Sequence, residues 1–420
     1  MSVFLYNIFL WLFRAGIRVA ALFNPKAKKW VAGRKGLLAA LRAAVPPDEK
    51  VIWVHCASLG EFEQGRPVME ALRREYPSCK LLLTFFSPSG YEVQKDYKGA
   101  DWVFYLPMDS PSNARNFLEI VHPVLVIFVK YEFWYYYLKK IKYRNIPLVL
   151  ISALFRRDMS FFRWYGGLQR KILSRFDRLF VQNESSARLL EEIGLGAITS
   201  ISGDTRFDRV KDISDRFEPV PAAAQFAGNH KLIVAGSTWR EDEALLARSL
   251  PFFQQNEIKL VVAPHEVDPG NIAVLREKFP GAILYSELVK GTPVPADQPC
   301  LIIDNIGLLS RLYKYAFCAF VGGGMRPEGV HNVLEAAVYG CPVFFGPYYK
   351  KYSEAIGLVE NGGAFPVKDA EKFMDRLDQF ITDPSLYGHA AFNAGSYVSS
   401  RTGAVKKIMD YIQEKRLLTS

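Results

Sequence analysis

Residues 320–346 read FVGGGMRPEGVHNVLEAAVYGCPVFFG and join two apolar runs through a glycine-rich loop and a helix. Glycines between a strand and a helix allow a phosphate or a ring of a ligand to approach the backbone, and the helix start adds free N–H donors. We expect the helix to carry His331, Asn332 and Glu335, with the last two on one face because they lie three residues apart. A carboxylate there suits the hydroxyls of a ribose. The stretch therefore predicts a strand–loop–helix unit that binds a nucleotide-sugar.

Outward from this stretch, short apolar runs alternate with amphipathic segments in two parts of the chain. Such alternation is typical of parallel strands joined by crossover helices. The strands predicted in the first part are 51–55, 80–86, 102–106, 124–129, 147–153 and 178–182, with helices such as 61–76 and 184–194 between them. Those predicted in the second part are 231–237, 259–265, 282–286, 300–305, 317–323 and 341–346, followed by helical sequence from about 369.

A polar, proline-bearing segment near 203–230 separates the two parts and is interpreted as a linker. The chain of 420 residues is long enough for two domains with separate cores. Two such domains place a ligand cleft between the carboxyl ends of both sheets. The predicted divisions are an N-terminal helical segment (1–47), a first Rossmann-like domain (48–208), the linker (209–230), a second Rossmann-like domain (231–395), and a C-terminal helix that could pack back on the first domain (396–420).

Composition narrows the class of protein. Half of the residues are hydrophobic, which argues against disorder. The five cysteines are scattered and form no C-x-x-C pair, so free thiols in a reducing compartment are expected. The six histidines fall at unrelated places, so no metal site is predicted. The net charge of +10 is concentrated in residues 1–47, which contain eight Lys or Arg and no acidic residue; this uneven basicity argues against a broad nucleic-acid surface.

The N-terminal run VFLYNIFLWLFRAGIRVAALF (3–23) is rich in aromatic and aliphatic residues but contains Arg14 and Arg18. A transmembrane helix seldom carries two central arginines, and a signal peptide would have its positive charge first and then a cleavage site. A helix lying in the membrane interface fits best, with aromatic side chains at the acyl boundary and cations on anionic headgroups. The alternative is an ordinary buried helix of the first domain.

Glu61 directly follows the first strand, at the start of a helix. Ser58-Leu59-Gly60-Glu61 also matches a capping box, in which the Glu61 carboxylate accepts from the Ser58 N–H. From the pattern alone, capping and general-base catalysis both remain open. A helix N-terminus lowers the pKa of a carboxyl group, which weakens a base, whereas burial against Phe62 or an apolar substrate opposes that effect.

Other loops at predicted strand ends offer polar groups. In the first part, Ser87, Ser89 and Gly90 suit phosphate or sugar oxygens but are also ordinary turn residues, and Glu132 is either an acceptor-side carboxylate or a cap. The candidates of the second part lie at one sheet edge: the small-residue loop Gly236-Ser237-Thr238, the strand end Pro264-His265, and the strand end Asp304-Asn305-Ile306-Gly307. A single histidine at a strand end is more often structural than catalytic. The position of all these residues at the carboxyl ends of one sheet is what favours a ligand-binding site.

Taken together, these loops resemble the 3-deoxy-D-manno-octulosonic acid (Kdo) transferases across nearly the whole chain. The matching segments occur in the family's order: GRKG (33–36), ASLGE (57–61), SPSGYE (87–92), YEFW (131–134), ISGDTRFD (201–208), GST (236–238), IDNIGLLSRLY (303–313) and FVGGGMRPEGVHNVLEAA (320–337). Each segment alone is weak, and their number and order carry the resemblance.

The resemblance implies an α/β fold of the GT-B type, with two Rossmann-like domains facing across a cleft and an N-terminal membrane-associating helix. It implies Kdo transfer from CMP-Kdo to a lipid A precursor at the cytoplasmic face of the inner membrane, without a cofactor or metal and without nucleic acid as a partner. Glu61 falls at the position of the family's proton acceptor, which favours the catalytic interpretation over capping. The resemblance implies CMP contacts at Pro264, His265, Ile306, Gly307, Leu308, Asn332, Val333, Leu334 and Glu335. The loop patterns add Ser237, Thr238 and Gly323 on the donor side and Ser87, Ser89, Gly90 and Glu132 as acceptor-side candidates.

Three positions depart from the family pattern. His265 stands where an arginine is common, Ile306-Gly307-Leu308 stands where Met-Gly-Glu is frequent, and Lys130 replaces an acidic residue. These departures affect single contacts rather than the fold. Two other classes stay open: a GT-B transferase or epimerase that uses another nucleotide-sugar, and a non-catalytic membrane-bound protein with this fold. Intact Glu61 and Glu335 argue against the second class.

Overall fold

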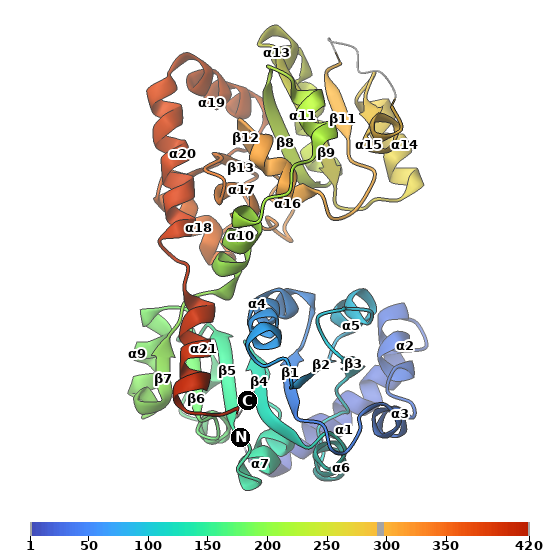
Figure 1. The fold of residues 1–420 in the computed structure, drawn as a ribbon, viewed down its shortest axis with the longest axis vertical. Helices are drawn as coiled ribbons and strands as arrows, with labels where there is room; N and C mark the ends of the chain where they lie inside the picture. Colours follow the sequence, from blue (N-terminus) through green and yellow to red (C-terminus); the bar gives the residue numbers. More distant parts are fainter. Residues whose placement is uncertain (1, 292–297, 419–420) are drawn as a thin grey trace. The chain divides into compact units, whose positions relative to one another are not determined.

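The computed structural model describes residues 2–291 and 298–418. The chain divides into two units, one formed by residues 1–208 and 402–420 and the other by residues 209–401. Each unit is built on a parallel sheet with helices on both of its faces (Figure 1). The predicted fold class, two α/β domains with alternating strands and helices, is confirmed.

The sheet of the first unit has the strand order β3-β2-β1-β4-β5-β6-β7. Its strands are β1 (Val51–Cys56), β2 (Lys80–Phe85), β3 (Trp102–Tyr105), β4 (Pro123–Val129), β5 (Leu148–Ala153), β6 (Arg178–Val181) and β7 (Thr199–Ile201). The chain runs from β1 outward to β3 and then returns to β4 on the other side of β1. The switch point of the sheet therefore lies between β1 and β4, which is where ligands bind in open α/β sheets.

The helices of the first unit cover both faces of this sheet, with α4 and α5 on one face and α1, α6 and α7 on the other (Figure 1). Alternate residues of β1 enter two different cores, because side chains of a strand alternate between the faces: Trp53 packs on the α6 side and Ile52 on the α4 side. The helices are α1 (Val3–Ala20), α2 (Pro25–Ala32), α3 (Leu37–Ala44), α4 (Leu59–Glu75), α5 (Pro88–Gln94), α6 (Pro111–Val121), α7 (Tyr135–Tyr143), α8 (Gly167–Leu173), α9 (Glu184–Glu192) and α21 (Ala404–Glu414).

The last helix of the chain belongs to the first unit. Ile408, Met409 and Ile412 of α21 are buried in the core on the α4 side of the first sheet. Asp208 accepts hydrogen bonds from the N–H groups of Gly403 (2.7 Å) and Ala404 (3.0 Å), so its carboxylate caps the start of α21. The end of the chain thus completes the core formed by residues between Ile52 and Phe180.

The sheet of the second unit has the order β10-β11-β9-β8-β12-β13-β14, with its switch point between β8 and β12. Its strands are β8 (Lys231–Thr238), β9 (Ile258–Pro264), β10 (Ile283–Leu284), β11 (Cys300–Ile302), β12 (Cys318–Val321), β13 (Val343–Phe345) and β14 (Ala364–Pro366). Its helices are α11 (Pro221–Ala227), α12 (Arg240–Arg248), α13 (Leu250–Gln255), α14 (Pro269–Lys278), α15 (Tyr285–Val289), α16 (Leu309–Leu312), α17 (Leu334–Ala337), α18 (Ser353–Glu360), α19 (Ala370–Thr382) and α20 (Pro384–Ser399).

Three local features differ from the sequence-based expectations. The segment interpreted as a linker contains α11 and the end of α10 (Thr205–Asp215), since Pro221 starts a helix of alanines. The helix expected to carry His331 and Asn332 begins only at Leu334, because the Asn332 side chain accepts from the Leu334 N–H (3.2 Å) and so precedes the helix. The short edge strands β7 and β14 were not predicted, because neither has the apolar run of an inner strand.

Helix α1 is the one helix of the described residues that is long and apolar enough to cross a membrane by length and composition. Only Tyr6 and Leu10 of α1 are buried. The Tyr6 hydroxyl donates to Asp109 (2.7 Å), so this helix is attached to the first unit along one face. An ordinary buried helix would expose less, since the large apolar side chains exposed near this end are Phe4, Leu5, Ile8, Phe9, Trp11, Leu12, Val19, Leu22 and Phe23.

Candidate active site

Glu61 lies at the switch point of the first sheet, in the first turn of α4 directly after β1. Its carboxylate accepts a hydrogen bond from the Ala57 N–H. Ser58 is the N-cap residue of α4, yet its side chain makes no capping hydrogen bond, so the capping box inferred from the sequence is only half formed. Glu61 does satisfy backbone donors at the helix start, and this contact also fixes its position.

The pKa of Glu61 is raised to about 8. Burial is the largest cause, because it penalises the charged carboxylate, and the charge of Glu132 adds to it; the N–H donors of Ala57 and Ser58 and the charge of Lys130 oppose both. The rise in the pKa of Glu61 caused by burial is therefore larger than the decrease caused by the N–H groups at the helix start. A carboxyl group with a pKa close to neutral is suited to accept a proton.

Glu132 follows β4, on the other side of the switch point, and is held by two donors. Its carboxylate is 3.0 Å from His55 Nε2 and accepts from the Trp134 indole N–H. His55 is fully buried in β1, and its Nδ1 lies 2.8 Å from the Thr84 hydroxyl. This chain of contacts fixes the second carboxylate close enough to raise the pKa of the first. His55 and Thr84 were missed in the sequence because they lie inside strands, with no loop signal.

Ser87, Ser89 and Gly90 lie at the end of β2, beside the Glu61 loop. The Ser87 N–H donates to the Ala57 carbonyl (2.7 Å), and Ala57 in turn donates to Glu61. The Ser87 hydroxyl caps α5 by accepting from the Ser89 N–H (3.2 Å). Gly90 is packed against Phe85, where an added Cβ would lie 2.3 Å from the ring. The first unit thus brings Glu61, Glu132 and the Ser87 loop to one sheet edge.

Lys130 directly follows β4 and has a positive φ of 65°. This left-handed conformation is uncommon for a residue other than glycine. Its charge acts on Glu61, whose pKa it lowers. The departure noted at this position therefore places a cation near the candidate base.

In the second unit, the loops after β8 and β12 meet at the switch point. The Gly322 N–H donates to the Gly236 carbonyl (2.9 Å), and a Cβ on Gly322 would lie 2.3 Å from the Ser237 carbonyl oxygen. Gly323 has a φ of +85° and donates its N–H to Asp242 (2.8 Å). The same Asp242 carboxylate accepts from the Trp239 N–H (2.9 Å). Asp242, on α12, thus holds both loops together.

Asp242 was missed in the sequence, although it lies three residues after Trp239, the spacing of a carboxylate that bonds back to a helix start. Burial raises its pKa to about 6 against the hydrogen bonds from Gly323 and Trp239. Thr238 is also buried, and its hydroxyl donates to Glu243 (3.3 Å). The Thr238 side chain of the predicted GST loop therefore makes a hydrogen bond within the protein.

Three aromatic rings stack beside this loop. The ring centroids of His265 and Trp239 are 4.6 Å apart, and those of His265 and His331 are 4.5 Å apart. The Trp239 indole N–H donates to His331 Nε2 (2.9 Å), which requires a neutral imidazole. Burial lowers the pKa of His331 to about 4 and also lowers that of His265. The guanidinium of Arg326 lies 4.4 Å from the Trp239 ring centroid.

The remaining donor candidates lie around the same edge. Asn332 donates to the Glu335 carboxylate (2.9 Å), so these two side chains form one polar pair even though Asn332 precedes the helix. Pro264, Val333 and Leu334 are buried and shape the backbone, whereas Ile306 is 89% exposed after β11. Gly307 has a φ of +97°, and Leu308 is buried. Trp239 and Arg326 were not predicted, because no motif distinguishes them from ordinary core and surface residues.

A cavity of about 580 Å³ opens next to the GST loop. Of the predicted donor residues, only Thr238 lines it, and its walls include the carboxylates of Glu241, Glu266 and Asp268. The Glu243 side chain and the guanidinium groups of Arg240 and Arg326 also line it, so the cavity carries charges of both signs.

Comparisons with known proteins agree with the family suggested by the sequence. Residues 31–209 match the family model described as 3-deoxy-D-manno-octulosonic-acid transferase (kdotransferase). Proteins named 3-deoxy-D-manno-octulosonic acid transferase align over most of the chain: one from Aquifex aeolicus is 27% identical, covering 79% of this chain and 86% of its own length. Those from Haemophilus influenzae and Bordetella pertussis are 25% identical, covering 94% and 97% of this chain and 94% and 96% of their own lengths.

Solved structures share the fold at lower identity. A putative UDP-N-acetylglucosamine 2-epimerase from Listeria monocytogenes covers 89% of this chain and 98% of its own, with a TM-score of 0.58 and 15% identity. UDP-GlcNAc 2-epimerase from Neisseria meningitidis covers 87% of this chain and all of its own, with a TM-score of 0.59 and 17% identity. At this identity the likeness concerns the GT-B fold alone.

Proposed function

We propose that the chain, which resembles the Kdo transferase family of glycosyltransferases, moves Kdo from CMP-Kdo to a sugar hydroxyl of a lipid A precursor. Glu61 is the general base of this proposal. The observation that carries it is a buried carboxyl group at the switch point of the first sheet, with a pKa of about 8 and a fixed contact to the Ala57 N–H.

The proposed reaction is a single inverting displacement. The acceptor oxygen attacks the anomeric carbon of Kdo as its proton passes to Glu61, and the bond between that carbon and the CMP phosphate breaks. A sugar hydroxyl is too weak an acid to ionise fully beforehand, so proton transfer and attack are concerted. Glu132 supports this role by raising the pKa of Glu61.

The donor is proposed to bind at the carboxyl edge of the second sheet. Glu335, oriented by Asn332, accepts hydrogen bonds from the ribose hydroxyls. The glycine loop and the Ser237 region allow the close approach of a phosphate, whose negative charge is stabilised by N–H and hydroxyl donors. CMP carries one phosphate, so no clamp for a pyrophosphate is required. The expected ligand cleft between the two domains stays a prediction.

The proposed site of action is the cytoplasmic face of the bacterial inner membrane. A lipid A precursor carries acyl chains and remains in the membrane, so the enzyme has to work at its surface. The exposed apolar side chains of α1 and the cations of residues 1–47 supply the two attractions that hold a helix at an anionic interface.

Incubation of the full chain with CMP-Kdo and lipid IVA, followed by mass spectrometry, tests the proposal. We expect a product that is heavier by one or more Kdo units, and the mass also counts those units. No product with an acceptor-saturated enzyme would refute Kdo transfer. Thermal melting separates the alternative donors: CMP should raise the Tm and UDP should not, whereas protection by UDP alone would favour another GT-B transferase or an epimerase.

A further inference from the structure

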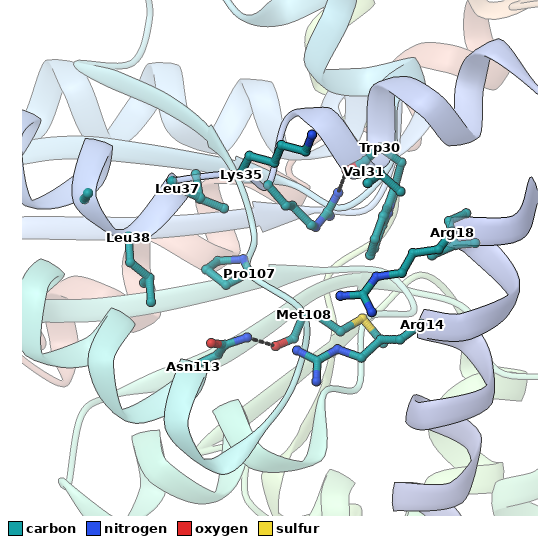
Figure 2. Close-up of a pocket in the computed structure, with 14 residues that line it drawn as sticks. Arg14, Arg18, Trp30, Val31, Lys35, Leu37, Leu38, Pro107, Met108 and Asn113 are labelled. Atoms are coloured by element: carbon teal, nitrogen blue, oxygen red, sulfur yellow. Dashed lines mark hydrogen bonds between the residues drawn. The ribbon is translucent and has the colours of Figure 1, made fainter. Parts of the chain in front are cut away.

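A second cavity, of about 490 Å³, lies in the first unit between α1, α2, α3 and the loop after β3 (Figure 2). This volume is in the range of sites that bind small molecules. Four cationic side chains line it, and the remaining walls are mostly apolar. The cations are Arg14, Arg18, Arg34 and Lys35, and the apolar walls include Leu38 and Trp30.

Arg34, from the GRKG segment, is the most enclosed of these cations. Its guanidinium donates to the carbonyls of Leu106 (3.0 Å), Trp30 (3.2 Å) and Phe86 (2.8 Å), and it lies 3.8 Å from the Trp30 ring centroid. All of these partners are neutral. Burial lowers the pKa of Arg34, since desolvation penalises its charge.

The glycines around Arg34 shape this corner. A Cβ on Gly33 would lie 2.2 Å from the Tyr105 ring, and Gly36 turns the chain with a φ of +65° to begin α3. The GRKG segment, which the proposed transfer reaction leaves without a role, therefore positions one guanidinium in the cavity wall.

Acidic partners are lacking at this cavity. Within residues 2–291 and 298–418, none of the four lining cations has a carboxylate within 4 Å. Asp109, next in sequence to the lining Met108, accepts from the Tyr6 hydroxyl and from the N–H groups of Tyr136 and Tyr137 instead. Arg34 is partly buried, whereas Arg14, Arg18 and Lys35 are exposed. Four like charges around one cavity repel each other, so an anion that joins them is stabilised.

The cavity adjoins the apolar helix. Figure 2 shows the side chains of Arg14 and Arg18 extending from α1 toward Met108 and Asn113, with Leu38 across the cavity. The same helix exposes Phe4, Leu5, Ile8 and Phe9. A ligand that fits both features has an anionic head and apolar chains, and a free phosphate ion would leave the apolar surface unmatched.

We propose that this cavity binds the phosphate headgroup of an anionic membrane phospholipid, whose acyl chains lie along the exposed apolar face of α1. The phospholipid is favoured over a soluble anion because two of the four cations, Arg14 and Arg18, share α1 with the exposed apolar surface. This site anchors the first unit to an anionic membrane and does not depend on the Kdo transfer reaction.

The test uses the full chain and monomeric dihexanoyl lipids in isothermal titration calorimetry. Dihexanoyl phosphatidylglycerol should bind at least tenfold more tightly than dihexanoyl phosphatidylcholine and more tightly than glycerol 3-phosphate, which lacks the chains. Equal binding of the two lipids would overturn the proposal. Binding of lipid IVA to this cavity without any binding of phosphatidylglycerol would also overturn it, because the occupant would then be the acceptor.

Matched variants assign the binding to the cavity. The triple variant R14Q/R18Q/K35Q should lose phosphatidylglycerol affinity by about fivefold for each cation removed, the effect of one charge near an anionic surface. The control K171Q/R188Q/K406Q removes three exposed cations from α8, α9 and α21 and should stay within twofold of the wild type. Equal losses of affinity in both variants would show that binding depends on net charge alone and would refute the site.

Two single substitutions at one residue keep the test valid if the triple variant does not fold. Ala39 is an exposed helical residue at the cavity rim, so A39E and A39Q should both fold, which thermal melting checks. A39E should weaken phosphatidylglycerol binding several-fold through repulsion, whereas A39Q should not. Identical affinities of A39E and the wild type would contradict a phosphate in this cavity.

Discussion

The replacement Glu61→Gln is the most direct test of the proposed mechanism. Glutamine keeps the size of the side chain and an oxygen that can accept from the Ala57 N–H, but it cannot take a proton. Loss of a general base typically lowers a rate by about 10²- to 10⁴-fold. We expect kcat with CMP-Kdo and lipid IVA to fall within this range while the fold is retained.

The pH profile supplies a second magnitude. With a pKa of about 8, roughly a tenth of Glu61 is ionised at pH 7 and roughly nine-tenths at pH 9. The kcat/KM of the wild type should therefore rise about tenfold between these pH values, because the ionised form is the base. The residual activity of Glu61→Gln should lack this rise.

Stability gives a readout that is independent of activity. The pKa of Glu61 is higher in the folded state than in the unfolded state, so the folded state holds its proton more tightly. The wild type consequently loses stability as the pH rises from about 4.5 to about 8, and the loss is complete above the folded pKa. Glutamine does not titrate, so the variant should gain stability relative to the wild type over this window, by up to about 5 kcal/mol at about 1.4 kcal/mol per unit of pKa.

Urea unfolding at pH 5, 7 and 9 measures this gain, and a product assay over the same range measures kcat/KM. Glu70→Gln is the matched control, since Glu70 lies on the same helix in an ordinary i,i+4 pair with Arg66. Near-normal turnover of Glu61→Gln would refute the base assignment. A stability difference that stays constant from pH 5 to pH 9 would refute the raised pKa.

Three further predictions follow from individual contacts. Glu132→Gln removes a charge that raises the pKa of Glu61, so the pH profile of kcat/KM should move to lower pH; an unchanged profile would exclude this coupling. Asp242→Ala leaves the N–H groups of Gly323 and Trp239 without their acceptor and should lower the free energy of unfolding by about 1–3 kcal/mol for each, as measured by denaturant titration, with weaker CMP binding; Asp242→Asn should lose less. The variant L5S/F9S/L12S changes exposed residues of α1 but keeps Tyr6 and Leu10, so its membrane-bound fraction should fall in a flotation assay while activity on detergent-dispersed acceptor is retained; an unchanged fraction would contradict interfacial binding by this helix.

The sequence alone predicted the inner strands well. The strands β4 and β9 are buried on both faces from Leu125 to Val129 and from Ile258 to Pro264, and largely apolar runs of this kind are typical of parallel strands. The edge strands β7 and β14 escaped notice because they are short and partly exposed. The start of α17 was placed too early, since the capping preference of Asn332 competes with helix periodicity.

What the sequence by itself determined was the alternation of strands and helices, the family, and the loops at the strand ends that hold Glu61 and the glycines. Those are local patterns, and parallel strands necessarily gather their carboxyl ends at one edge. Only the tertiary structure decided the pKa of Glu61, because its burial depends on the folded chain and the charge that acts on it belongs to Glu132, 71 positions away in the sequence. It also showed how Asp242 joins two loops and how Arg34 meets Arg14 and Arg18 in one cavity, since electrostatics depends on distances in space rather than along the sequence.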